Sequence, residues 1–230
     1  MTPTVLIPGL VCTAELFAPQ IPALWSHGPV TIASTLEGDT IAGMAAAILR
    51  DAPPRFALGG LSMGGYVALE ILRQAPERVV KLALLDTAAR PDTPEQSTQR
   101  RALIARVEAG ELEAVLHQIA PNLLHPDHRM DQRLIELQVR MGLALGAAGF
   151  VRQQIAIIGR IDSRPRLADI KVPTLVLVGD KDALTPPDRS EEMAAAIPDA
   201  RLVVVPNCGH ASTLEQPETV NAALAEWLNV

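Results

Sequence analysis

Cysteine is scarce in this sequence, which contains only Cys12 and Cys208. Two cysteines are too few for a disulfide framework, so we expect two free thiols in a reducing, cytoplasmic environment. The amino-terminal segment MTPTVLIPGL lacks a basic region, so we predict no secretory signal. No apolar run approaches the roughly 20 residues that span a bilayer, and we therefore expect no membrane association.

An excess of positive charge is also missing, since the formal net charge is −6. Nucleic-acid-binding proteins concentrate Lys and Arg on one face, so we expect no nucleic-acid partner. Neither a G-x-G-x-x-G segment nor a P-loop is present, and the sequence therefore predicts no nucleotide cofactor. What remains is an ordinary globular composition, 48% hydrophobic and 20% charged, in a chain long enough for a sizeable core.

Short apolar runs alternate with segments of helical spacing along most of the chain. Ile41, Met44 and Ile48 follow helical spacing after Asp39, which we expect to cap that helix. The strand candidates are apolar on both faces, as in parallel strands that helices cover on two sides. The pattern therefore predicts an α/β fold with a twisted, mostly parallel sheet. The strand candidates begin at Thr4, Val30, Phe56, Lys81, Thr174 and Arg201.

Residues 90–164 interrupt this alternation with helical patterns and no convincing strand. We predict a core formed by residues 1–89 and 165–230, with residues 90–164 as an inserted helical segment. Ligands of parallel sheets bind at the carboxyl ends of the strands, where this insertion leaves the sheet, so we favour an active-site cap. A second helical domain with no role at the site is the alternative.

The segment Gly60-Leu61-Ser62-Met63-Gly64 matches G-x-S-x-G and lies between a strand and a helix. A sharp strand-to-helix turn strains the serine backbone and brings neighbouring chain close, so side chains at the two glycines would clash. Such strain suits a serine whose Oγ must face a substrate above the sheet. The free N–H groups of the following helix would favour developing negative charge.

A serine hydroxyl needs a base, and His210 is the histidine that closely follows a strand. The base in turn needs a carboxylate that orients it. Asp180 and Asp182 both follow the strand TLVLVG, and we favour Asp182 because it lies further out on the loop. Asp86, at the end of another strand, is a third candidate.

The order Ser62, Asp182, His210 resembles the α/β-hydrolase family over almost the whole chain. The resemblance rests on the G-x-S-x-G turn, the G-x-x-D segment 179–182, the Gly209-His210 pair and the helical insertion. It implies that Ser62 is the nucleophile, His210 the general base and Asp182 the acid that orients it. A serine at this place argues against the epoxide-hydrolase and haloalkane-dehalogenase branches, which use Asp.

The resemblance also implies an oxyanion hole made of two backbone N–H groups. One is the N–H of Met63, the residue after the nucleophile. The other comes from the loop IPGLVCTAEL, where Leu10 is our candidate. Many family members have His-Gly at the start of this loop, whereas this chain has Pro8-Gly9.

Three functions remain open. The first is a serine hydrolase that cleaves carboxylic esters, lactones or thioesters through an acyl-enzyme. The second uses the same triad as a cofactor-free haloperoxidase or C–C bond hydrolase. The third is a ligand receptor built on the same fold.

Two other segments contain residue types that can bind metals or act as nucleophiles. The HPDH segment from His125 to His128 has no clear metal-ligand geometry, so we expect no metal there. Cys208 lacks a turn like that of Ser62, and we expect it to pack in the core.

Aromatic residues make up only 3% of the chain. We therefore predict an aliphatic pocket for a small-molecule substrate with an apolar acyl group. Arg152 and Arg160 could anchor a carboxylate, although exposed arginines are the more common case.

Overall fold

The computed structural model describes residues 1–230 and contains one parallel sheet of six strands. The strand order is β2-β1-β3-β4-β5-β6, and every neighbouring pair is parallel. The predicted fold class is therefore confirmed. The strands are β1 (Thr4–Ile7), β2 (Val30–Ile32), β3 (Phe56–Leu61), β4 (Val79–Leu85), β5 (Thr174–Gly179) and β6 (Ala200–Val205).

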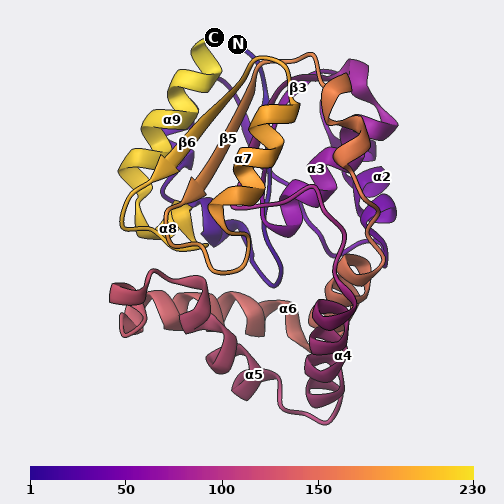
Figure 1. Ribbon diagram of the computed structural model, residues 1–230, viewed down its shortest axis with the longest axis vertical. Helices are drawn as coiled ribbons and strands as arrows, with labels where there is room; N and C mark the ends of the chain where they lie inside the picture. Colours follow the sequence, from indigo (N-terminus) through magenta and orange to yellow (C-terminus); the bar gives the residue numbers. More distant parts are fainter.

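Helices cover both faces of the sheet (Figure 1). On one face pack α2 (Ile41–Asp51), α3 (Met63–Gln74) and α7 (Pro187–Ala196), and on the other pack α1 (Ile21–Trp25) and α9 (Pro217–Asn229). The strands β3 and β5 are buried over their whole length, because helices exclude water from both sides. Their unbroken apolar sequences follow from this position.

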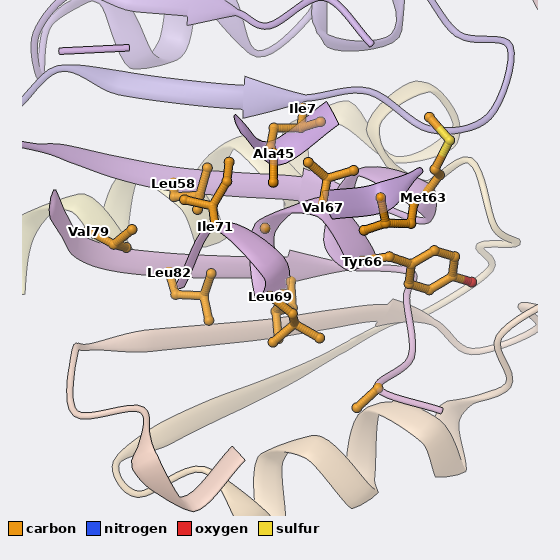
Figure 2. Close-up of a cluster of buried hydrophobic side chains, with 14 of the residues drawn as sticks. Ile7, Ala45, Leu58, Met63, Tyr66, Val67, Leu69, Ile71, Val79 and Leu82 are labelled. Carbon is orange, nitrogen blue, oxygen red and sulfur yellow. The ribbon is translucent and has the colours of Figure 1, made fainter. Parts of the chain in front are cut away.

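The helix α3 follows directly on the turn that carries Ser62. Met63, Val67 and Ile71 lie along one side of this helix and are fully buried in the larger apolar cluster (Figure 2). They pack over strand residues such as Leu58 and Leu82. The first turn of α3 is therefore held by the core rather than by a surface loop.

One N-cap differs from the sequence prediction. The cap of α2 is Thr40, whose Oγ1 accepts a hydrogen bond from the N–H of Gly43 at 2.9 Å, and not Asp39. Both residue types cap helices well, and the backbone at Thr40 has the extended conformation that a cap requires. The position of the first helical turn therefore decides between two adjacent candidates.

Three α-helices lie between β4 and β5 and share an apolar cluster of their own. They are α4 (Pro94–Glu108), α5 (Leu112–Ile119) and α6 (Gln132–Ile158). Figure 1 shows them together at one end of the sheet, beyond the carboxyl ends of β5 and β6. Short helices complete the chain: η1 (Ala14–Phe17), η2 (Pro76–Arg78), η3 (Ala120–Leu123), η4 (Pro126–His128), η5 (Arg164–Asp169) and α8 (Ser212–Glu215).

The helix α6 is long and apolar enough to cross a membrane, judged by length and composition alone. This corrects the expectation that no segment is long and apolar enough. The helix is interrupted at Gly146, where φ is 71° and ψ is 177°. Its two halves run in different directions and pack against α4 and α5 (Figure 1). Its apolar residues, including Leu134, Val139 and Phe150, form the cluster of the helical segment.

Candidate active site

Ser62 occupies a strained turn between β3 and α3. Its φ of 55° and ψ of −116° are unusual for a residue with a side chain. The turn is tight on both sides, because a Cβ at Gly60 would lie 2.2 Å from the carbonyl oxygen of Gly64. A Cβ at Gly64 would lie 2.0 Å from the carbonyl oxygen of Ile7. The two glycines of the G-x-S-x-G segment are thus required by close backbone contacts.

His210 and Asp182 meet above the sheet. The Nδ1 of His210 lies 2.8 Å from the Oδ2 of Asp182, and both side chains are almost fully buried. The remaining lone pairs of Asp182 are used as well. Its Oδ1 accepts hydrogen bonds from the N–H groups of Leu184 and Thr185, and its Oδ2 accepts one from the Thr185 hydroxyl. Asp182 is therefore rigidly placed to orient the imidazole.

The charges of this pair support each other. Burial lowers the pKa of His210, but the carboxylates of Asp182, Asp86 and Glu215, with Asp182 foremost, together raise it by more, so the net pKa is above its ordinary value. Burial likewise raises the pKa of Asp182, while His210 and the Thr185 hydrogen bonds lower it by more. Asp182 is therefore ionised at neutral pH, and His210 holds its proton more tightly than a free histidine.

Ser62 and His210 line the same cavity, which has a volume of about 490 Å³. No hydrogen bond joins the Oγ of Ser62 to His210, and the Nε2 of His210 has no partner within the protein. The Nδ1 contact with Asp182 leaves Nε2 as the nitrogen that is free to act as a base. Hydrogen bonds of catalytic groups are often loose without substrate and tighten when it binds.

The loop after β1 forms another part of the cavity wall. Gly9, Leu10 and Val11 all line the cavity. The N–H of Val11 donates to the Oε1 of Gln153 at 2.7 Å, so it is not free to bind a ligand. The N–H groups of Leu10 and Met63 make no such side-chain hydrogen bond and stay our candidate oxyanion donors.

Two other carboxyl candidates are placed differently. Asp180 accepts a hydrogen bond from the N–H of Cys208 at 3.0 Å. Asp86 is fully buried, where its Oδ1 accepts from the N–H of Gly179 and its Oδ2 from the hydroxyl of Ser212. Burial and the nearby Asp182 carboxylate raise the pKa of Asp86 to about 8. Neither carboxyl group makes a hydrogen bond with His210.

Glu215 is a buried carboxylate that the sequence arguments did not single out. Its Oε1 accepts from the N–H of Gly209, and its Oε2 accepts from the N–H of His125 and lies 2.8 Å from the Nδ1 of His128. It therefore ties the loop of His210 to the helical segment. The HPDH histidines contact this carboxylate, and no group of three or more metal-ligating side chains is present.

The two arginines considered from the sequence have different environments. Arg152 is not part of the cavity and donates to the carbonyl of Leu36 at 2.5 Å. Arg160 does line the cavity, and its side chain is only 7% exposed, which corrects the expectation of an exposed arginine. It is buried because Asp92 and the ring of Tyr66 both hold its guanidinium.

Cys208 is fully buried and does not line the cavity. Burial raises the pKa of its thiol, so it stays protonated at neutral pH. A buried neutral thiol outside the cavity is a packing residue. Ser62, in contrast, lies on a strained turn in the cavity wall.

A six-stranded parallel sheet, with Ser62 on a strained turn and a His–Asp pair at the same cavity, defines a hydrolase-like α/β protein. The model of the alpha/beta hydrolase family matches residues 5–223. The chain belongs to this family, and the esterases among its relatives support the general function of a hydrolase.

Several relatives and solved structures are similar to the chain. A pimeloyl-[acyl-carrier protein] methyl ester esterase of Aromatoleum aromaticum is 28% identical, covering 86% of this chain and 82% of the relative. A thermophilic esterase from Thermogutta terrifontis, solved with malate bound, is 33% identical with a TM-score of 0.90 and covers 100% of this chain and 90% of its own. The enol-lactonase from Burkholderia xenovorans is 26% identical with a TM-score of 0.90, and the match covers 100% of this chain and 92% of the enol-lactonase chain.

Other relatives are provisionally named carbamate hydrolases and non-heme bromoperoxidases. The names therefore agree on the family and differ in the reaction.

Proposed function

We propose that the protein is a serine hydrolase that cleaves a carboxylic ester, lactone or thioester through an acyl-enzyme. The observation that carries the proposal is the 2.8 Å contact between His210 and Asp182 at a cavity that Ser62 also lines. A base oriented by a carboxylate is what a serine nucleophile requires. The similarity to esterases and to an enol-lactonase supports the same reaction class.

In the first half of the reaction, the Oγ of Ser62 attacks the carbonyl carbon of the substrate while its proton passes to the Nε2 of His210. The carbonyl oxygen becomes an oxyanion, which the N–H groups of Leu10 and Met63 stabilise. The intermediate then collapses, the bond to the leaving group breaks, and His210 gives its proton to the departing oxygen or sulfur. Ser62 is left as an ester of the acyl group.

In the second half, a water molecule takes the place of the leaving group. His210 accepts one proton from this water as its oxygen attacks the acyl carbon. The second tetrahedral intermediate collapses, His210 returns the proton to the Oγ of Ser62, and the carboxylic acid leaves. Asp182 remains ionised throughout and stabilises the imidazolium that forms in each half.

An activity-based fluorophosphonate probe tests the nucleophile. We expect labelling at Ser62, turnover of short p-nitrophenyl esters, and loss of both in Ser62→Ala. Ser26→Ala is the matched control, because Ser26 is exposed and lies far along the chain at the end of α1. Ester cleavage retained by pure Ser62→Ala would reject the proposal.

The two other functions give different outcomes in the same experiment. Perhydrolysis in acetate and peroxide that exceeds ester hydrolysis would favour a haloperoxidase-like use of the triad. Ligand binding with neither labelling nor turnover would favour a receptor.

A further inference from the structure

The charged side chains that line the cavity are all of positive sign. Its wall contains four arginines, and no Asp or Glu lines it. These arginines are Arg90, Arg100, Arg160 and Arg189. The carboxylates that pair with them are Glu192, Asp92 and Asp188, which all lie outside the lining. The cavity therefore presents guanidinium groups and no carboxylate to a substrate.

Two of these arginines share a single carboxylate. The Nε of Arg100 lies 2.7 Å from the Oδ2 of Asp92, and the Nη1 of Arg160 lies 2.6 Å from its Oδ1. The side chain of Asp92 is only 1% exposed, so solvent does not screen the group from its partners. One carboxylate between two guanidinium groups leaves one positive charge without a counterion in the protein.

The two guanidinium groups also keep hydrogen-bond donors free. Arg100 uses its Nε and Nη1, the latter on the Oε1 of Gln154. Arg160 uses its Nε on the carbonyl of Arg90 and its Nη1 on Asp92 and Ile157. The Nη2 groups of both arginines make no hydrogen bond within the protein. Guanidinium groups with free N–H donors are well suited to bind a carboxylate.

The two arginines and the nucleophile share one cavity. Ser62, Arg100 and Arg160 all line it, and its volume is about 490 Å³. Tyr66, one helical turn after Ser62, lines it as well, and the guanidinium of Arg160 lies 4.3 Å from the centre of the Tyr66 ring. Leucine and isoleucine side chains, among them Leu103 and Ile119, line the same cavity.

We propose that the substrate carries a carboxylate in addition to the bond that is cleaved, and that Arg100 and Arg160 bind it. This inference rests on the proposed function, because it assigns the substrate class of the same site. The aliphatic side chains would contact the methylene groups between the two ends. The substrate class is therefore a half-ester, half-thioester or lactone of a short aliphatic dicarboxylic acid.

Two esters of similar length test this assignment. The first is p-nitrophenyl hydrogen glutarate, whose acyl group ends in a carboxylate, and the second is p-nitrophenyl pentanoate, which is neutral. We expect kcat/KM to be at least tenfold higher for the charged ester. Arg100→Gln should reduce kcat/KM for the charged ester by roughly 10- to 100-fold and change that of the neutral ester by less than about threefold.

Arg101→Gln is the matched control, because Arg101 is exposed on the same helix and does not line the cavity. This substitution removes the same charge and should leave kcat/KM unchanged for both esters. Equal losses for the two esters in Arg100→Gln would mean a structural role and would overturn the inference. A wild-type protein that does not prefer the charged ester would overturn it as well.

A binding measurement separates this inference from the proposed function. Ser62→Ala should bind methyl hydrogen glutarate in a calorimeter and bind methyl pentanoate at least tenfold more weakly, and adding Arg100→Gln should remove the difference. If this result is found but neither ester is turned over, the proposed reaction fails and the anion site stands. If binding of the two methyl esters is equal, the anion site is rejected whatever the turnover.

Discussion

The side-chain Oε1 of Gln153 accepts a hydrogen bond from the backbone N–H of Val11 at 2.7 Å, although 142 positions separate the two residues. Gln153 comes from the second half of α6 and is fully buried. Val11 has a φ of 50°, which is a strained value for a β-branched residue. The helical segment therefore fixes the loop after β1, next to the Leu10 N–H that we propose as an oxyanion donor.

Gln153→Met should lower kcat while changing KM little. Methionine has a similar size but lacks the amide oxygen, so the buried N–H of Val11 loses its acceptor. A lost oxyanion donor costs about 10²–10³-fold in kcat, and a displaced one should cost roughly tenfold or more. We also expect a loss of about 1–3 kcal/mol in the free energy of unfolding. Steady-state kinetics and urea unfolding measure both effects.

Gln132→Met is the control for this change, because Gln132 is exposed at the start of the same helix. A Gln153→Met protein that is less stable but has an unchanged kcat would show that the contact stabilises the fold without positioning the oxyanion loop.

Ser62→Gly should be more stable than Ser62→Ala, although both should be inactive. The φ of 55° strains any residue with a Cβ, and such strain is about 1–3 kcal/mol. Glycine relieves this strain, but its greater conformational freedom in the unfolded chain lowers the free energy of unfolding by about 0.5–1 kcal/mol. A net gain of about 1 kcal/mol corresponds to a Tm roughly 2–4 °C higher for a protein of this size. Equal melting temperatures of the two variants would argue against strain at this turn.

The pH dependence of kcat/KM should follow the ionisation of His210. The base must be neutral. Burial lowers the pKa of His210, but Asp182, with smaller help from Asp86 and Glu215, raises it above its ordinary value. We therefore expect activity to rise with pH, with a midpoint above about 6.5. In Asp182→Asn the chief cause of the raised pKa is gone, so the midpoint should move to lower pH. The kcat should fall by about 10⁴-fold, because the imidazole loses its orientation.

Stability provides a second readout for this pair. The lowered pKa of Asp182 stabilises the fold above its unfolded pKa, and the raised pKa of His210 stabilises it below its unfolded pKa. The full contribution is therefore present between about pH 4 and 6.5. The stability difference between wild type and Asp182→Asn should be largest in this window. A pH–rate midpoint that does not move in the variant would contradict the assignment of Asp182.

Asp86→Asn should stabilise the protein increasingly as pH rises from about 4 to 8. The fully buried carboxyl of Asp86 has a pKa raised to about 8, so its ionisation opposes folding throughout this range. The slope is at most about 1.4 kcal/mol per pH unit. Asparagine keeps an oxygen for the N–H of Gly179 and an amide for the hydroxyl of Ser212. Urea unfolding at several pH values checks the effect, and parallel curves for wild type and variant would refute it.

Much of the fold follows from local sequence patterns. All six strands begin within two residues of their predicted starts, because short, mostly apolar runs between helical segments leave few other options. The glycines around Ser62 were predicted from the same local geometry that the structure contains. The sequence predicts the cap of α2 one residue too early, at Asp39 instead of Thr40, since both are good capping residues.

The contacts made by residues far apart in the chain were not predictable in the same way. Gln153 lies in a helical pattern like any other polar residue, and nothing nearby marks its contact with Val11. Glu215 meets the His125–His128 segment only after the chain has folded. The sequence favours an exposed Arg160 because most arginines are exposed, and only the packing of Asp92 and Tyr66 buries it.

The sequence by itself determined the strands, their alternation with helices and the strained serine turn, because these depend on residues that are neighbours along the chain. Tertiary structure decided that Asp182 rather than Asp180 contacts His210, since both follow the same strand and only the direction of the loop distinguishes them. It also decided the charge of the cavity, because folding places the arginines in its lining and leaves the carboxylates that pair with them outside it.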